Sequence, residues 1–186
     1  MKIGIITGST REGRKNNKVA EYVLDFAKKL NADAEFELVD IKDFDLPMFN
    51  SMPPGMLHRQ YDDPRISKWS EKIDSLDGFI FVISEYNKSV TPALLNAYDL
   101  ISPEWHNKAA GLIGFGSTGA VTALQLFRIT LSQSNIAVLG TFADFSLFTD
   151  FDADGNFVPQ EFRKTNLEKV INGTVNWAKA MKTVRD

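Results

Sequence analysis

The sequence has no cysteine and only two histidines, and each shortage excludes a class of site. Without a thiol there is no disulfide, no thiolate nucleophile and no cysteine-ligated metal. The histidines, His58 and His106, are too few for a three-histidine metal site, and no G-x-S-x-G nucleophile elbow accompanies them. We expect both to lie on the surface, with contact between His106 and a ligand or partner chain as the alternative.

The chain also lacks a marked excess of charge and a long apolar run. Lysine and arginine number 21 against 24 acidic residues, and the net charge is −3. Nucleic-acid binding would need a clustered basic surface, so no such partner is expected. A membrane span would need a run of about 18 apolar residues, and residues 1–6 are too short for the core of a signal peptide. A cytoplasmic protein without a membrane partner is therefore expected.

Short β-branched and aromatic runs alternate along the chain with longer segments of helical periodicity. Strands are predicted at residues 2–7, 35–41, 78–84, 109–115 and 136–139, the last with an alternative extension to 145. Helices are predicted at residues 16–30, 66–75, 91–101, 120–133 and 161–181. Such alternation is typical of a parallel sheet covered on both faces. We predict one α/β domain over residues 1–186, a flavodoxin-like doubly wound five-stranded parallel sheet of order 2-1-3-4-5 with helices on both faces.

Polar loops follow three of the predicted strands, at residues 8–16, 84–89 and 116–119. In doubly wound sheets the ligand lies beyond the carboxyl ends of the strands, where the strand order reverses. Strands one, three and four are neighbours in the order 2-1-3-4-5. The three loops should therefore converge on one cleft, which supports a binding site more strongly than any single motif.

The first loop, Gly8-Ser9-Thr10-Arg11, has the composition of a phosphate-binding turn. Glycine allows close approach of the backbone, hydroxyls donate hydrogen bonds, and the N–H groups at the start of the next helix attract an anion. Arg11 and Arg14 add positive charge, and a guanidinium can hold phosphate through two hydrogen bonds. A polar turn with solvated basic residues is the alternative interpretation.

Two other phosphate motifs do not fit this loop. The dinucleotide motif G-x-G-x-x-G has a glycine where Thr10 stands. The P-loop motif has the spacing of Gly8 and Gly13, but Arg14 and Lys15 stand where that motif has lysine and then serine or threonine. Because that hydroxyl is a magnesium ligand, a nucleoside triphosphatase is not expected.

These features together resemble the NADPH-dependent FMN reductase family, which includes flavin-, quinone-, azo- and chromate-reducing enzymes. The resemblance covers about residues 3–125, and it departs from the family at Ser84, where proline is usual. The segments that carry it are Gly8-Ser9-Thr10-Arg11-x-Gly13-Arg14, Leu46-Pro47-Met48-Phe49, Glu85-Tyr86-Asn87, Pro92-x-Leu94-Leu95-Asn96-Ala97 and Gly116-x-x-Gly119.

The resemblance implies a bound FMN and assigns residues to its two ends. The residues implied at the phosphate are Ser9, Arg11, Arg14, Asn16 and Asn17. The residues implied along the isoalloxazine ring are Glu85, Tyr86, Asn87, Gly116, Ser117, Thr118 and Gly119. For Tyr86 and Asn87, an ordinary turn that carries a tyrosine is the alternative.

The implied activity is that of an FMN-dependent NAD(P)H oxidoreductase. Electrons would pass from NADPH or NADH through FMN to a small acceptor such as a quinone, an azo compound, chromate or free flavin. Because the flavin supplies the hydride chemistry, no catalytic acid or base side chain is expected. Backbone N–H groups near Gly119 should stabilise negative charge on the reduced ring. The alternatives are an electron carrier without nicotinamide activity and a regulatory module without the cofactor.

Residues 150–161 match the calcium loop of an EF-hand at every position that the motif specifies. The motif requires an incoming helix, whereas residues 143–149 are predicted as strand or loop. A solvated turn before the last helix is therefore favoured over calcium binding, and no metal site is expected.

The segment between the second strand and the second helix is unusually apolar for a loop. It either packs into the core or forms an exposed surface that covers the flavin or contacts another subunit. The helix at 91–101 is open to the same two interpretations, and the resemblance implies a homodimer or homotetramer. The apolar residues of the segment are Met48, Phe49, Met52, Met56 and Leu57.

Overall fold

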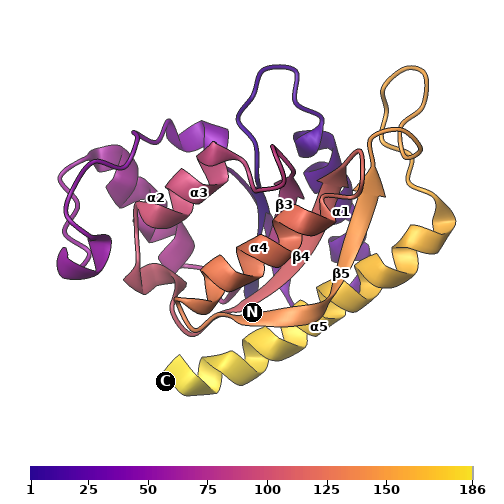
Figure 1. Ribbon diagram of the computed structural model, residues 1–186. Helices are drawn as coiled ribbons and strands as arrows, with labels where there is room; N and C mark the ends of the chain where they lie inside the picture. Colours follow the sequence, from indigo (N-terminus) through magenta and orange to yellow (C-terminus); the bar gives the residue numbers. More distant parts are fainter. Residues whose placement is uncertain (186) are drawn as a thin grey trace.

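The computed structural model describes residues 1–185, and at its centre lies one five-stranded parallel sheet (Figure 1). The strands are β1 (Lys2–Thr7), β2 (Glu35–Asp40), β3 (Gly78–Ser84), β4 (Ala109–Gly116) and β5 (Ala137–Ser146). Their order across the sheet is β2-β1-β3-β4-β5, and every neighbouring pair is parallel. The predicted fold class and strand order are confirmed.

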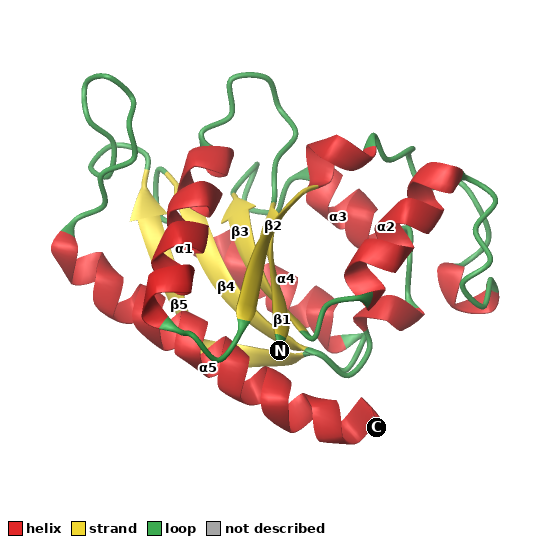
Figure 2. Ribbon diagram, turned by 180° about the vertical axis from the view of Figure 1, so that it is seen from behind, coloured by secondary structure: helices red, strands yellow, loops and turns green. Residues whose placement is uncertain are grey.

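Helices cover both faces of this sheet. They are α1 (Asn16–Leu30), α2 (Pro64–Asp74), α3 (Pro92–Asp99), α4 (Val121–Ser132) and α5 (Glu161–Arg185), with short 3₁₀ helices η1 (Ile41–Phe44), η2 (Pro54–Met56) and η3 (Pro103–Trp105). The buried residues of α1 and α5 form one core and those of α2, α3 and α4 the other. Figure 2 shows α1 and α5 together on their face of the sheet. None of the helices described within residues 1–185 has both the length and the apolar character needed to cross a bilayer.

All seven residues of β3 are buried, because helices pack on both of its faces. Ile80 and Val82 belong to the core beneath α1 and α5, whereas Phe79 and Phe81 belong to the core beneath the other helices. A strand covered on both sides needs apolar residues at every position. This is why an uninterrupted apolar run predicted the bounds of β3 correctly.

Strand β5 continues beyond residue 139 to Ser146, with an irregularity in its register against β4. Gly140 and Thr141 are exposed in the middle of the strand, so the apolar pattern breaks after Leu139 although the pairing resumes. The predicted extension to 145 is therefore the correct alternative. It brings the loop after β5 to the same edge of the sheet as the loops after β1, β3 and β4.

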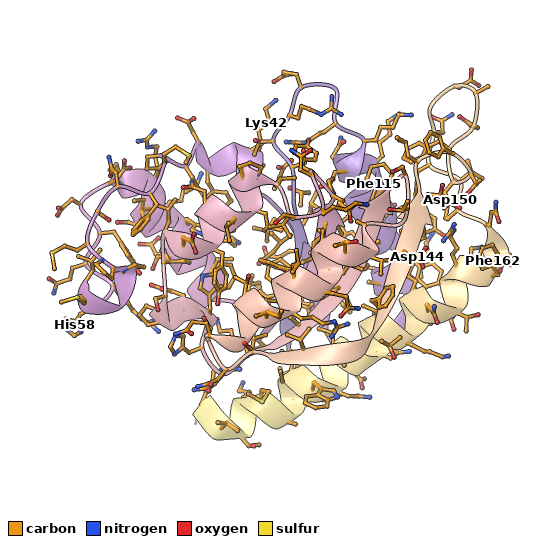
Figure 3. All side chains as sticks on the ribbon, viewed as in Figure 1. Lys42, His58, Phe115, Asp144, Asp150 and Phe162 are labelled. Carbon is orange, nitrogen blue, oxygen red and sulfur yellow. The ribbon has the colours of Figure 1, made fainter. Side chains whose placement is uncertain are left out.

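The acidic turn at residues 150–161 is organised by a buried carboxylate. Asp150 is fully buried, and it accepts hydrogen bonds from the backbone N–H groups of Ser146 at 2.6 Å and Gln160 at 3.0 Å. It also pairs with Arg163 at 2.7 Å, between the end of β5 and the start of α5 (Figure 3). In the described part of the chain, no group of three or more His, Asp or Glu side chains is arranged to hold a metal ion.

The apolar segment before α2 is exposed rather than packed into the core. Met48, Met52 and Met56 are 72%, 56% and 61% exposed. For these side chains the core interpretation is wrong, and an exposed contact surface is the alternative that stays open. His58, near the end of this segment, is exposed (Figure 3). His106 is exposed as well, as expected.

Lys108 is a buried cation at the edge of the sheet opposite the loops. It is 4% exposed, and its Nζ donates to the carbonyl oxygens of Ile73 at 2.7 Å and Asp74 at 3.1 Å, at the end of α2. Burial lowers the pKa of Lys108 to about 8 from the ordinary 10.5. Folding therefore releases a proton from this group between these two pH values.

We expect Lys108 to make the folded state more stable as the pH rises from 8 to 10. In this range the unfolded lysine holds a proton that the folded one loses, so the free energy of unfolding should increase by about 2 kcal/mol relative to Lys108→Met. Urea denaturation at pH 7, 8, 9 and 10 measures this difference, with Lys179→Met as an exposed control. A constant difference between wild type and Lys108→Met across the range would contradict the prediction.

Candidate functional site

A cleft of about 600 Å³ opens at the carboxyl edge of the sheet, a volume typical of ligand pockets. The predicted residues that line it are Ser9, Arg11, Arg14, Asn16, Glu85, Tyr86, Gly116 and Ser117. Asn17, Asn87, Thr118 and Gly119 lie outside its lining, and their contacts with a cofactor stay predictions. Lining residues that the sequence analysis did not assign to the site are Gly13, Lys15, Ser84, Phe115, Leu147 and Phe148.

The first loop is held against β3 through the side chain of Asn16. This side chain is 1% exposed; its Oδ1 accepts from Gly8 N at 3.1 Å, and its Nδ2 donates to Val82 O at 2.9 Å. A Cβ at Gly8 would stand 2.8 Å from Val82 O, so only glycine fits this close approach. The amide of Asn16 therefore has a structural role in holding the first loop.

Arg14 is neutralised within the protein. Its guanidinium forms a close ion pair with Asp40 and donates to Ser9 O at 3.0 Å. The two charged side chains are only 12% and 14% exposed, and Asp40 also accepts from Thr7 Oγ1 at 2.9 Å. Arg14 therefore shapes the first loop, and its charge is largely balanced before any ligand arrives.

Two other cations at this end of the cleft carry no such counter-charge. Among residues 1–185, neither Arg11 nor Lys15 forms an ion pair. Nζ of Lys15 lies 4.6 Å from the ring centroid of Phe151, which belongs to the loop after β5. The first turn of α1 contains no acidic residue, and the side chain of the residue before it accepts no capping hydrogen bond. Cations and open helix N–H groups together make this end suited to an anion.

Tyr86 joins the first loop to the loop after β3. Its hydroxyl lies 3.1 Å from Ser9 Oγ and accepts from Arg11 Nε at 3.2 Å. It starts a tight turn in which Asn87 and Lys88 both have positive φ, at 51° and 69°. Asparagine tolerates this left-handed conformation, and the turn leaves Asn87 exposed at its tip, outside the lining of the cleft.

The opposite end of the cleft contains a carboxylate at the start of α4. Glu85 Oε2 accepts a hydrogen bond from Ala123 N, in the first turn of that helix, at 3.2 Å. Ala120, which precedes the helix with φ of 56°, has no side chain that can cap it. Glu85 thus performs, from a different loop, the capping that Ala120 cannot perform.

The loop after β4 is packed against β5 at Gly119. This glycine has φ of +70°, and a Cβ there would stand 2.9 Å from the carboxylate of Asp144. Asp144 pairs at 2.7 Å with Arg163, the same arginine that pairs with Asp150. Figure 3 labels the two aspartates, near the end of β5 and the start of α5. One arginine on α5 therefore fixes the position of both this loop and the loop after β5.

The fourth wall of the cleft comes from the loop after β5. Leu147 and Phe148 line it, and Leu147 N donates to Gly116 O at 3.0 Å. Figure 1 shows this loop and the loop after β1 rising from the same edge of the sheet. The polar loops of the sequence predicted only the walls that follow strands one, three and four. The alternative extension of strand five to residue 145 is the signal that could have revealed this wall.

The sequence matches the NADPH-dependent FMN reductase family over residues 1–147. The chain belongs to this family. An NAD(P)H-dependent FMN reductase of Nectria sp is 36% identical over 124 residues, which make up 63% of this chain and 61% of that protein, less than two thirds of its length. One of Saccharomyces cerevisiae is 29% identical over 149 residues, which make up 75% of this chain and 78% of that protein.

Solved structures support the fold of this FMN reductase family member. A flavoenzyme NAD(P)H:(acceptor) oxidoreductase from Paracoccus denitrificans superposes with a TM-score of 0.75 at 22% identity. The superposition covers 97% of this chain and 98% of that one. The family match ends at residue 147, just after β5, whereas the structural likeness also covers most of the chain beyond it, where α5 lies.

We expect Asn16 and its neighbour Asn17 to respond differently to substitution by alanine. Asn16→Ala should lower the free energy of unfolding by about 1–3 kcal/mol, because buried backbone groups lose their partner. Asn17→Ala should have a smaller effect, because Asn17 Oδ1 is buried without a hydrogen-bond partner among residues 1–185. Urea denaturation of the FMN-free protein measures both, and equal losses would contradict the assignment of Asn16.

Proposed function

We propose that this protein is an FMN-dependent NAD(P)H oxidoreductase that passes electrons to a small acceptor such as a quinone, an azo compound, chromate or free flavin. Membership of the FMN reductase family supports the proposal. The observation that carries it is the uneven charge of the cleft, with Arg11, Lys15 and the open start of α1 all at one end. In this proposal residues 1–186 act as one cytoplasmic domain.

The residues of the cleft fit FMN when its charged and aromatic parts are considered separately. The phosphate is assigned to Ser9, Arg11 and Lys15 with the backbone at the start of α1, and Arg14 supports that loop from behind. The ring then takes the other end of the cleft. The side chains that line this end are Glu85, Tyr86, Phe115, Leu147 and Phe148, with Gly116 and Ser117.

Bound FMN supplies the hydride chemistry, and the side chains bind and orient it. Arg11 and Lys15 hold the phosphate end, and the hydroxyl of Tyr86 keeps the loops after β1 and β3 together. Phe148, which is 73% exposed, lines the cleft on the side of β5. The nicotinamide donor and the acceptor use the same open side in turn.

Assembly into a homodimer or homotetramer is part of the proposal. Leu95 on α3 and Leu126 and Ile129 on α4 are 38%, 46% and 70% exposed, on the same side of the sheet. With the exposed methionines of residues 48–57 they offer apolar surface of the kind that marks subunit contacts.

The purified protein, supplied with excess FMN, should show visible flavin absorption that bleaches on anaerobic addition of NADPH or NADH. The visible spectrum before and after addition measures both binding and reduction. Bands that stay oxidised with both nucleotides would favour the electron carrier instead. Failure to take up FMN would contradict both the enzyme and the carrier.

We expect Arg11 and Lys15, which form no ion pair within residues 1–185, to bind FMN through its phosphate. Arg11→Ala should weaken FMN binding by about 1.5–3 kcal/mol, the usual contribution of a hydrogen bond to a charged group, and Lys15→Met should weaken it in the same direction. Fluorescence titration with FMN and with riboflavin, which lacks the phosphate, measures the effect. Lys18→Met is the matched control, because Lys18 donates to Gly155 O outside the cleft. Equal losses for both ligands would remove these residues from the phosphate site.

A further inference from the structure

Two helices begin at the cleft, and their first turns differ in charge. The first turn of α1 contains no acidic residue and receives no cap from the side chain before it. The first turn of α4 receives a carboxylate from another loop, because Glu85 Oε2 accepts from Ala123 N at 3.2 Å. One helix start is therefore open to an anion, whereas the other already holds one.

Glu85 is well placed to act on whatever occupies the ring end of the cleft. Its side chain is 12% exposed, it lines the cleft, and its Cβ would lie 4.0 Å from a Cβ added at Gly116. Lys88 Nζ lies 3.5 Å from Glu85 Oε1, but this lysine is 69% exposed, so water screens its charge. Lys88 therefore offsets the negative charge of this carboxylate only weakly.

This arrangement changes the expectation for the start of α4. From the sequence alone we expect the N–H groups near Gly119 to stabilise negative charge on the reduced ring, as the start of an uncapped helix would. A carboxylate at the same place compensates the helix dipole and repels added negative charge, more strongly in a partly buried site than in water. Transfer of a hydride, two electrons with one proton, adds one negative charge to the ring.

We propose that Glu85 is a positioning residue that lowers the reduction potential of the bound flavin. It fixes the start of α4 at the cleft wall and places a negative charge at the ring end, which favours the oxidised form. A lower potential makes electron transfer from the reduced flavin to the acceptor more favourable. The inference rests on the proposed function, since it needs FMN bound with its phosphate at Arg11 and Lys15.

The test is the midpoint potential of the FMN-loaded protein, measured by anaerobic titration against reference dyes. Glu85→Gln keeps an oxygen that can accept from Ala123 N and removes the charge. We expect it to favour binding of reduced over oxidised FMN about tenfold, which raises the potential of a two-electron couple by about 30 mV. Lys88→Met should shift the potential the opposite way, by less. Glu161→Gln, an 85% exposed carboxylate at the start of α5, is the control for a change of net charge.

The proposal is supported if Glu85→Gln raises the midpoint potential, Lys88→Met lowers it and Glu161→Gln leaves it unchanged. A merely structural role of Glu85 would not produce shifts that follow the sign of the charge removed. Retained FMN with unmoved potentials, or shifts in the same direction, would overturn it. If Glu85→Gln fails to fold or to hold FMN, Lys88→Met decides alone: a lower potential supports the role of Glu85 and an unchanged or higher one overturns it. Failure of the wild type to bind FMN would overturn the proposed function itself.

Discussion

The side-chain amide of Asn16 is the interaction on which the site depends, because it ties the first loop to the central strand. It bonds Gly8 N on one side and Val82 O on the other, where the Gly8 backbone already approaches β3 too closely for a side chain. This contact fixes the direction in which α1 starts. The side chains of the loop, among them Ser9 and Arg11, are thereby presented to the loops after β3 and β4.

The two ends of the cleft differ in the sign of their charge. Arg14 is matched by Asp40 and holds the loop, whereas Arg11 and Lys15 line the cleft without an ion-pair partner among residues 1–185. At the other end Glu85 occupies the start of α4. Counting basic residues in the sequence would overstate the positive charge at the loop and would miss the negative charge opposite it. Only the pairing of residues distant in the chain shows that the cleft is asymmetric.

The sequence could predict the parts of this protein that are local or that follow from the strand order. The apolar run of β3 and the polar loops after β1, β3 and β4 sufficed to place most of the cleft. It could not predict partners that meet across the fold, such as Arg14 with Asp40, which lie 26 positions apart. Nor could the period of the apolar residues locate the end of β5, because Gly140 and Thr141 are exposed within it.

In the acidic turn, whose sequence matches the calcium loop of an EF-hand, Asp150 has a structural role. Asp150 would be the first calcium ligand of an EF-hand loop, yet its carboxylate is buried and bonded to Ser146 N and Gln160 N, near the two ends of the turn. Arg163 neutralises it and binds Asp144 beside Gly119 as well. Phe148 lies between Ser146 and Asp150, so the hydrogen bond from Ser146 N to this carboxylate also holds an aromatic wall of the cleft in place. The buried position of Asp150 is therefore explained by its part in shaping the cleft.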